Sequence, residues 1–259
     1  RKGRTRLSCR ASDFDGINQR FSGGNTSTGK TALSVFAWVR PTTLSGIKSI
    51  AGQYASGQIG YLIYFNGSKL TVEVSQDGGS VNRKSYISVQ SFSTNIWYMV
   101  GFTLDTVSDE MLFYSNGKQI SVTKNLDVNL SGIHDSTSPI EIGSNNGGSS
   151  CFTGQIQQPL IWESELTAAE VRDLYLHQYD DITAPDYGWF LDGDSANGLT
   201  SASPALTPIN SPGIYEDDAI GGGDWLNEKG WTNYENLIYP SEVFSAGNGW
   251  APANGAIRN

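Results

Sequence analysis

The segment from Ser75 to Arg83 holds the densest group of side chains that could recognise a ligand. Asp77, Asn82 and Arg83 offer planar carboxylate, amide and guanidinium groups, and small residues fill most positions between them. Sugars are bound by a few convergent groups of this kind together with aromatic surface. The segment therefore predicts a glycan-binding loop at Asp77, Asn82 and Arg83. A plain solvated connection between two strands is the alternative interpretation.

Paired carboxylates that would hydrolyse a polysaccharide are missing from the predicted strands. Glycoside hydrolysis uses two carboxyl groups, and residues two apart on one strand point in the same direction. Glu73 is followed two residues later by Ser75, and Glu141 by a glycine. Neither His134 nor His177 forms a recognisable catalytic or metal-binding motif in the sequence. We therefore expect no catalysis, and a polysaccharide-degrading enzyme is the least favoured alternative.

Strands must position these side chains, and residues 31–162 supply the strand pattern. Short apolar runs alternate with polar residues and end at turn residues, which indicates sheets with one buried face and one wet face. Within the strand at 32–39, the odd-numbered residues share one face and the even-numbered residues the other. Trp38, Trp97 and Trp162 belong to such runs, and we expect them in the core rather than in a sugar platform.

Turn and helix signals divide this pattern into hairpins and one helix. The Asn-Gly pairs at 66–67 and 116–117 each predict a tight hairpin turn with positive φ angles. Thr167 followed three residues later by Glu170 forms a capping box. The helix is expected to continue to about His177.

Composition limits the classes of partner that the chain can bind. The 259 residues carry a formal net charge of −9, which argues against a nucleic-acid surface, because phosphate binding depends on Lys and Arg. The sequence contains no run of about 18 apolar residues, so it predicts no membrane-spanning helix. Five of the 17 basic residues fall within the first ten positions, so we interpret residues 1–10 as a basic N-terminal arm.

The composition changes after residue 180, where Asp, Gly, Pro, Ser and Asn predominate. We expect residues 181–259 to form an extended linker and docking segment, or the start of a further β module. Large apolar residues return late in this segment, among them Trp231, Tyr234, Phe244 and Trp250. A disordered tail seldom holds so many, so these four residues are predicted to contact a neighbouring subunit of an oligomer or larger assembly.

Two cysteines, Cys9 and Cys151, both lie beside predicted strands. The first and last strands of a sandwich can pair, so the sequence allows a disulfide between them. A single pair of cysteines identifies no cellular compartment.

Six short motifs occur in the order and spacing of laminin-G-like, concanavalin-type domains, and the likeness covers residues ~10 to ~180. They are Phe14-Asp15-Gly16 and the runs at 36–41, 97–100, 114–117, 154–156 and 160–171. The resemblance implies an all-β, two-sheet antiparallel jelly-roll sandwich over residues 11–180 with one short helix. It also implies a surface recognition module, because similar domains bind glycans or mediate adhesion in secreted proteins and in bacteriophage virions.

The resemblance further implies a calcium ion as an optional cofactor. Related domains often hold one ion near the sandwich rim, and Asp15 matches the position of the family's Phe-Asp-Gly motif. Many relatives carry acidic residues where this chain has Gln157 and Gln158. Asp15 is therefore equally expected to form a turn beside Gly16.

The same resemblance bears on the setting of the protein. The runs at 187–193 and 236–244 resemble segments of phage surface proteins. They favour a virion surface, with a secreted extracellular protein as the alternative. Surface glycans are the predicted partners of a recognition module, and other virion subunits are the predicted partners of a structural decoration or fibre protein.

The predicted docking segment can be tested by truncation. Deleting the residues after Gly223 should abolish incorporation into an assembly, because the aromatic contacts are lost, while the sandwich stays folded. Co-purification with the particle and circular dichroism measure the two outcomes. Unchanged incorporation would refute the docking role.

Overall fold

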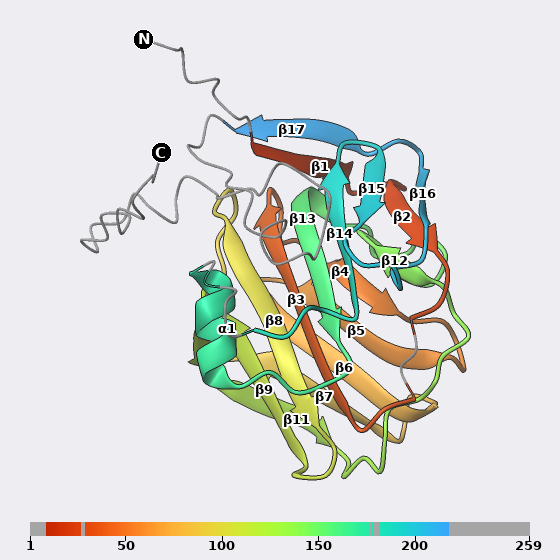
Figure 1. Ribbon diagram of the computed structural model, residues 1–259, viewed down its shortest axis with the longest axis vertical. Coiled ribbons are helices and arrows are strands. Elements are labelled where there is room, and N and C mark those ends of the chain that lie inside the picture. The colour runs from red at the N-terminus through yellow and green to blue at the C-terminus, as the bar shows by residue number, and fades with distance from the viewer. Residues whose placement is uncertain (1–8, 27–28, 177, 179–181, 218–259) are drawn as a thin grey trace, which may run out of the picture.

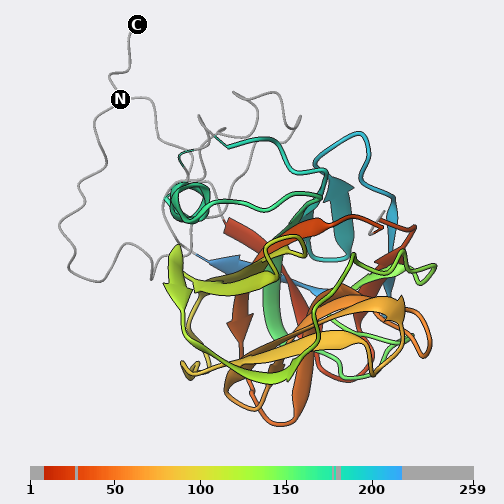
Figure 2. The same ribbon diagram turned by 90° about the horizontal axis from the view of Figure 1, so that it is seen from below.

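Alternating apolar and polar residues fold this chain into two stacked sheets (Figure 1; Figure 2). The computed structural model describes residues 9–26, 29–176, 178 and 182–217. Within these residues one sheet has nine strands and the other eight, and their strand pairings are antiparallel. The all-β, two-sheet jelly-roll sandwich with one short helix that the sequence predicts is confirmed.

The two sheets draw their strands from different parts of the chain. The nine-stranded sheet contains β1 (Cys9–Asp15), β3 (Ala32–Pro41), β8 (Tyr98–Asp105), β9 (Glu110–Ser115), β10 (Lys118–Ile120), β13 (Thr153–Trp162), β14 (Tyr187–Asp192), β15 (Ser195–Gly198) and β17 (Gly213–Asp217). The eight-stranded sheet contains β2 (Arg20–Gly23), β4 (Ile47–Gln53), β5 (Ile59–Asn66), β6 (Lys69–Gly78), β7 (Arg83–Ser88), β11 (Val122–Asp127), β12 (Ile140–Ile142) and β16 (Leu206–Ile209).

Strand order places long-range neighbours side by side. The nine-stranded sheet runs β10-β9-β8-β3-β13-β1-β17, with β14 paired to β13 and β15 paired to β14. The eight-stranded sheet runs β11-β7-β6-β5-β4-β12-β2-β16. The strands β4, β5, β6 and β7 are therefore consecutive both in the chain and in the sheet.

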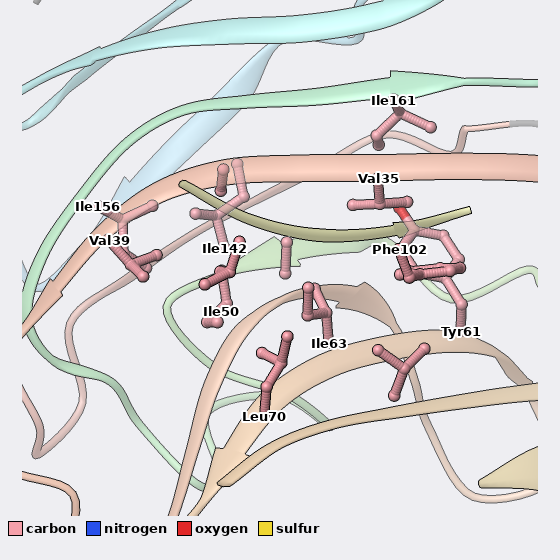
Figure 3. Close-up of a cluster of buried hydrophobic side chains, with 14 of the residues drawn as sticks. Val35, Val39, Ile50, Tyr61, Ile63, Leu70, Phe102, Ile142, Ile156 and Ile161 are labelled. Atoms are coloured by element: carbon pink, nitrogen blue, oxygen red, sulfur yellow. The ribbon is translucent and has the colours of Figure 1, made fainter. Parts of the chain in front are cut away.

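Apolar side chains on the two inner faces form the main core (Figure 3). The odd-numbered residues of β3 share one face, as predicted, and this face enters the main core. Each buried side chain of this size contributes roughly 1.5–3 kcal/mol by leaving water. The residues labelled in Figure 3 are Val35, Val39, Ile50, Tyr61, Ile63, Leu70, Phe102, Ile142, Ile156 and Ile161.

Helix α1 (Ala168–Tyr175) begins at the predicted capping box. Thr167 Oγ1 accepts from the Glu170 N–H at 3.3 Å, and Glu170 Oε2 accepts from the Thr167 N–H at 2.7 Å. These bonds satisfy backbone donors that the start of a helix leaves free. His177, the expected end of the helix, lies outside the described residues. Among the residues that are described, no helix has the length and apolar character needed to cross a membrane.

The even-numbered residues of β3 face a second core on the other side of the nine-stranded sheet. Phe36 and Trp38 pack there with Trp97, Trp162 and Val171 of α1. Both faces of β3 are therefore buried, and the expectation of one wet face is wrong for this strand, because α1 and the chain around it cover that face. The prediction that the three tryptophans lie in the core is confirmed, since none is more than 4% exposed.

The two predicted Asn-Gly turns differ in geometry. At 116–117 both residues have positive φ, 50° and 74°, as a tight turn between β9 and β10 requires. Asn66 instead ends β5 opposite Lys69, so that Gly67 and Ser68 form the turn. Gly67 alone among these four residues has positive φ, at 58°.

After residue 180 the chain adds four strands to the sandwich rather than a linker. β14 pairs with β13, β15 with β14, β16 with β2 and β17 with β1. The predicted boundary at residue 180 therefore falls inside the paired part of the chain, which continues to Asp217. Pairing satisfies backbone groups at sheet edges that would otherwise stay free. These runs are only 4 to 6 residues long and lie among turn residues, which is why they resembled a loop.

The remainder of the predicted terminal segments lies outside the described residues. Residues 1–8 of the basic arm are among them, and Cys9 and Arg10 belong to β1. The predicted assembly contacts at Trp231, Tyr234, Phe244 and Trp250 also lie outside, so they stay predictions.

The disulfide that the sequence allowed between Cys9 and Cys151 is not formed, because Cys151 carries a free thiol. Cys9 begins β1, whereas Asp15 at the other end of β1 pairs with Thr153. The two cysteines are therefore separated by at least the length of β1, about 20 Å at ~3.3 Å per residue. A disulfide needs Cα atoms within about 7 Å.

A buried lysine links the two sheets at one end of the sandwich. Lys84 of β7 is fully buried, and its Nζ lies 2.7 Å from Asp127 Oδ1 and 2.8 Å from Asp109 Oδ1. Asp127 belongs to β11 in the same sheet, whereas Asp109 lies in the turn between β8 and β9 of the other sheet. Tyr86 also donates its hydroxyl to Asp127, and Lys124 Nζ lies 2.9 Å from Asp127 Oδ2. Removing one partner of a buried ion pair strongly destabilises a protein, although the intact pair adds little net stability.

This cluster predicts how acid affects stability. Burial opposes ionisation of Asp127, but hydrogen bonds from Lys84, Tyr86 and Lys124 outweigh it and hold the pKa of Asp127 well below its usual value. Its contribution is therefore present above the unfolded pKa of about 4 and is lost as the pH falls toward the folded pKa. Asp127→Asn should lower the free energy of unfolding at pH 7, and the difference from wild type should shrink below about pH 4.

Urea unfolding of both proteins at pH 3 to 8 measures this difference. Asp194→Asn, at an exposed carboxylate, is the control and should follow the wild type. A difference for Asp127→Asn that stays constant over this range would contradict the role of the ion pair.

Candidate functional site

The outer face of the eight-stranded sheet is polar, whereas that of the other sheet is aromatic. Its central side chains are enclosed by their neighbours, since Ser49, Tyr64 and Thr71 are at most 6% exposed. Alternate residues of β5 and β6 enter the main core, so the residues between them point outward. Tyr64 of β5 lies directly opposite Ser49 of β4 and Thr71 of β6, and the three form one row. Glu73 follows two residues after Thr71 on the same face.

Glu73 is held by two hydrogen-bond donors from neighbouring strands. Arg83 Nη1 of β7 lies 2.5 Å from Glu73 Oε2, and the Tyr64 hydroxyl donates to Oε1 at 3.0 Å. Tyr54, just after β4, brings its half-buried phenol within hydrogen-bonding reach of the Arg83 guanidinium. Bonds to ionised groups are roughly twice as strong as neutral ones. We call Tyr54, Tyr64, Glu73 and Arg83 the Arg83 patch.

The two phenols of the patch are held in their protonated form. Burial raises the pKa of Tyr64, and the negative charge of Glu73 raises it further. Burial also raises the pKa of Tyr54, with Glu73 adding to the shift and Arg83 opposing it. Each phenol therefore keeps an O–H donor beside an acceptor lone pair at neutral pH.

Three polar atoms of this face are buried without a hydrogen-bond partner among the described residues. They are Ser49 Oγ, Thr71 Oγ1 and Arg83 Nε. A buried polar group left unpaired costs roughly 1–3 kcal/mol. The two hydroxyls flank Tyr64 on either side. Enclosed groups of this kind are commonly satisfied by ordered water, so we expect water beside Tyr64.

The loop between β12 and β13 borders the patch. Its Asn146 N–H donates to the Tyr54 carbonyl oxygen at 3.0 Å. Glu141 of β12 holds the loop in place, since Oε1 accepts from the Gly147 N–H at 2.8 Å and Oε2 from the Ser144 hydroxyl at 2.6 Å. Glu141 thereby fixes the loop against which Tyr54 rests.

The residues predicted for a glycan-binding loop separate into two groups. Asn82 Nδ2 donates to Asp77 Oδ2 at 2.7 Å, and the Gly79 N–H donates to Asp77 Oδ1 at 2.9 Å. The hydrogen bonds from Asn82 and Gly79 lower the pKa of this exposed carboxyl group. The hydrogen bonds of Asp77 and Asn82 therefore lie within the connection between β6 and β7 and stabilise its turn. The Arg83 side chain instead contacts Glu73.

Sequence reasoning found Arg83 but missed the other three members of the patch. In the sequence Glu73 stands out only as one half of a catalytic pair, and neither Tyr54 nor Tyr64 belongs to a recognisable site motif. Strand alternation was the signal that could have found them, because it places Tyr64 and Glu73 on the face opposite to Ile63 and Val72. The sequence does not show that Tyr64 and Glu73 lie near Arg83, because this proximity depends on the order β5-β6-β7 in the sheet.

The comparison with known protein families decides the family of this chain. The family model described as the concanavalin A-like lectin/glucanases superfamily matches residues 15–172, which is more than half of the 259 residues. The chain belongs to this superfamily. The resemblance stated from six motifs is therefore confirmed. No curated protein matches the chain by sequence.

Solved structures show the same fold of this superfamily at low sequence identity. A heptameric SAP-like pentraxin from Limulus polyphemus has a TM-score of 0.59 at 14% identity, over 80% of this chain and 94% of that chain. A Bacteroides ovatus protein proposed to bind carbohydrate has a TM-score of 0.61 at 15% identity, over 82% of this chain and 61% of that chain. At such identities the likeness concerns the fold.

Asp15, the calcium ligand suggested by the superfamily resemblance, forms a turn. Its Oδ1 accepts from the N–H groups of Ile17 at 2.8 Å and Asn18 at 3.3 Å. Gln157 is occupied elsewhere, because its side chain exchanges hydrogen bonds with the backbone of Leu191. In the described part of the chain, no three His, Cys, Asp or Glu residues gather as metal ligands. Asp15 alone does not make a calcium site, and binding there stays a prediction.

The superfamily includes glucanases, so Glu73, the one carboxylate of the patch, needs a catalytic test. Glu73 lies opposite Leu62 on β5 and Ser85 on β7, and Ser75 is the next outward residue of its own strand. A retaining glycosidase needs a second carboxyl group about 5–5.5 Å away. None of these neighbouring positions supplies one, and the charge of Glu73 is already engaged by Arg83.

The free thiol of Cys151 gives a test of the local packing. Cys151 is buried, and its Sγ donates to the Gly148 carbonyl oxygen at 3.3 Å. Burial raises the pKa of this thiol, so little reactive thiolate forms at neutral pH. We expect slow labelling by a thiol reagent in buffer and at least tenfold faster labelling in denaturant. Peptide mass spectrometry measures the labelling of Cys151. Equally fast labelling in buffer and in denaturant would contradict this packing.

Proposed function

We propose that this chain is a non-catalytic glycan-binding module whose ligand contacts the Arg83 patch. One observation carries the proposal. The Arg83–Glu73–Tyr64 network lies on the polar outer face of the eight-stranded sheet, beside buried hydroxyls of Ser49 and Thr71 that have no partner among the described residues. Arg83, whose side chain is 21% exposed, is the member of this network that a ligand can contact directly.

The chemistry of the patch suits a sugar. Sugar-binding sites combine a few fixed polar groups with aromatic surface, and the patch supplies a carboxylate, a guanidinium and two phenols. Tyr64, Glu73 and Arg83 come from the adjacent strands β5, β6 and β7, so their spacing is held by the sheet. The same fold in the Bacteroides ovatus protein is consistent with this function.

The absence of catalysis is part of the proposal. It is supported by the neighbours of Glu73, which place no second carboxylate at the spacing that a retaining mechanism needs. Turnover of a polysaccharide by purified protein would refute it.

The setting of the module is proposed from the sequence motifs. We infer a virion surface, or the outside of a cell for a secreted form, with the module working inside an oligomer or larger assembly. The alternative of a structural decoration protein depends on Trp231, Tyr234, Phe244 and Trp250, and truncation after Gly223 tests it. Calcium is proposed only as an optional ligand of Asp15.

A glycan array with matched arginine variants tests the proposal. Arg83→Met keeps the aliphatic stem of Arg83 but removes its donors, so affinity for the best glycan should fall at least about tenfold, or ~1.4 kcal/mol. Arg172→Met is the control, because Arg172 is 61% exposed on α1 over the other sheet, and its affinity should match the wild type. The array is read with and without calcium.

Two results would contradict the proposal. The first is a wild-type protein that binds no glycan specifically under either condition. The second is equal binding by Arg83→Met and wild type, which would place the ligand away from the patch.

A further inference from the structure

We propose that the Arg83 patch takes a neutral sugar, through two adjacent hydroxyl groups, and discriminates against glycans that present an anionic group there. This inference rests on the proposed function and names the ligand class for the same site. It follows from how the charges of Arg83 and Glu73 are arranged.

Arg83 is already neutralised by the protein itself. Its Nη1 lies 2.5 Å from Glu73 Oε2, and the Glu73 side chain is only 10% exposed. The Tyr64 hydroxyl occupies the other carboxylate oxygen. A sulfate or carboxylate of a ligand would have to compete with Glu73 for Arg83. It would also place a second negative charge beside a carboxylate that solvent screens poorly.

Two adjacent hydroxyl groups of a neutral sugar neither displace Glu73 from Arg83 nor bring a second negative charge beside Glu73. The ion pair presents a carboxylate acceptor and a guanidinium donor side by side. One hydroxyl of a sugar can donate to Glu73 while its neighbour accepts from Arg83, because a hydroxyl both donates and accepts. Arg83 has five N–H groups and remains 21% exposed, so donors are left after Glu73 has taken its share.

The surroundings favour the same ligand class. Tyr54 is half-buried at the border of the patch and adds aromatic surface for the apolar face of a sugar ring. Its pKa is raised, so it brings no negative charge near neutral pH. The whole chain carries a formal net charge of −9, which disfavours the approach of polyanions.

Substituting the carboxylate by its amide tests the inference. The wild type should bind a neutral oligosaccharide at least about tenfold more tightly than the same oligosaccharide carrying a terminal sialic acid or sulfate, measured by calorimetry. Glu73→Gln keeps the shape but removes the charge, so this preference should fall below about threefold or invert. Glu110→Gln makes the same charge change at an exposed residue of the other sheet and should keep the preference.

Two further measurements keep the test decisive if Glu73→Gln unfolds. Glu73→Asp retains the charge and should retain the preference. Binding of the neutral glycan to the wild type should change less than about twofold between 50 and 500 mM salt, because no net charge is neutralised. Circular dichroism checks the fold of each variant.

The possible failures are distinguishable. Tighter wild-type binding of the anionic glycan, lost in Arg83→Met, would overturn the neutral ligand class and leave the proposed function standing. An unchanged preference in folded Glu73→Gln would also overturn the inference. Absence of binding to either glycan class on the array would refute the proposed function itself.

Discussion

Burial of the two inner sheet faces is the interaction on which the rest of the structure depends. Side chains alternate along each strand, so the strands that bury Ile63 and Val72 must turn Tyr64 and Glu73 outward. A register slip of one residue would exchange the two sets. The core therefore positions the candidate site as firmly as it stabilises the fold.

The two outer faces of the sandwich differ in what they present. The outer face of the nine-stranded sheet is aromatic and is closed by α1 and the chain around it. The outer face of the eight-stranded sheet carries a carboxylate–guanidinium pair, phenols and small hydroxyl residues. A ligand that needs hydrogen bonds finds them on the second face. Ion pairs on this sheet serve different purposes, because Lys84 ties the sheets together whereas Arg83 faces outward.

Much of the fold was predictable from local patterns. The strand alternation, the capping box at Thr167 and the core tryptophans each depend on residues close in the chain, and each was confirmed. The joining of β14–β17 to the sandwich and the separation of the cysteines depend on long-range pairing, which periodicity does not reveal. The candidate site was likewise predictable only in part. Arg83 was recognisable from its residue type, whereas the contacts that Glu73 and Tyr54 make with Arg83 depend on the order of the strands in the sheet.

NMR mapping of a bound glycan shows whether the ligand contacts the outer face of the eight-stranded sheet at the Arg83 patch. Titration of isotope-labelled protein with a glycan that binds should shift amide signals of β5, β6 and β7, with the largest changes around Tyr64, Glu73 and Arg83. Shifts confined to the rim around Asp15, or to the face covered by α1, would place the ligand away from the Arg83 patch and contradict the proposed site.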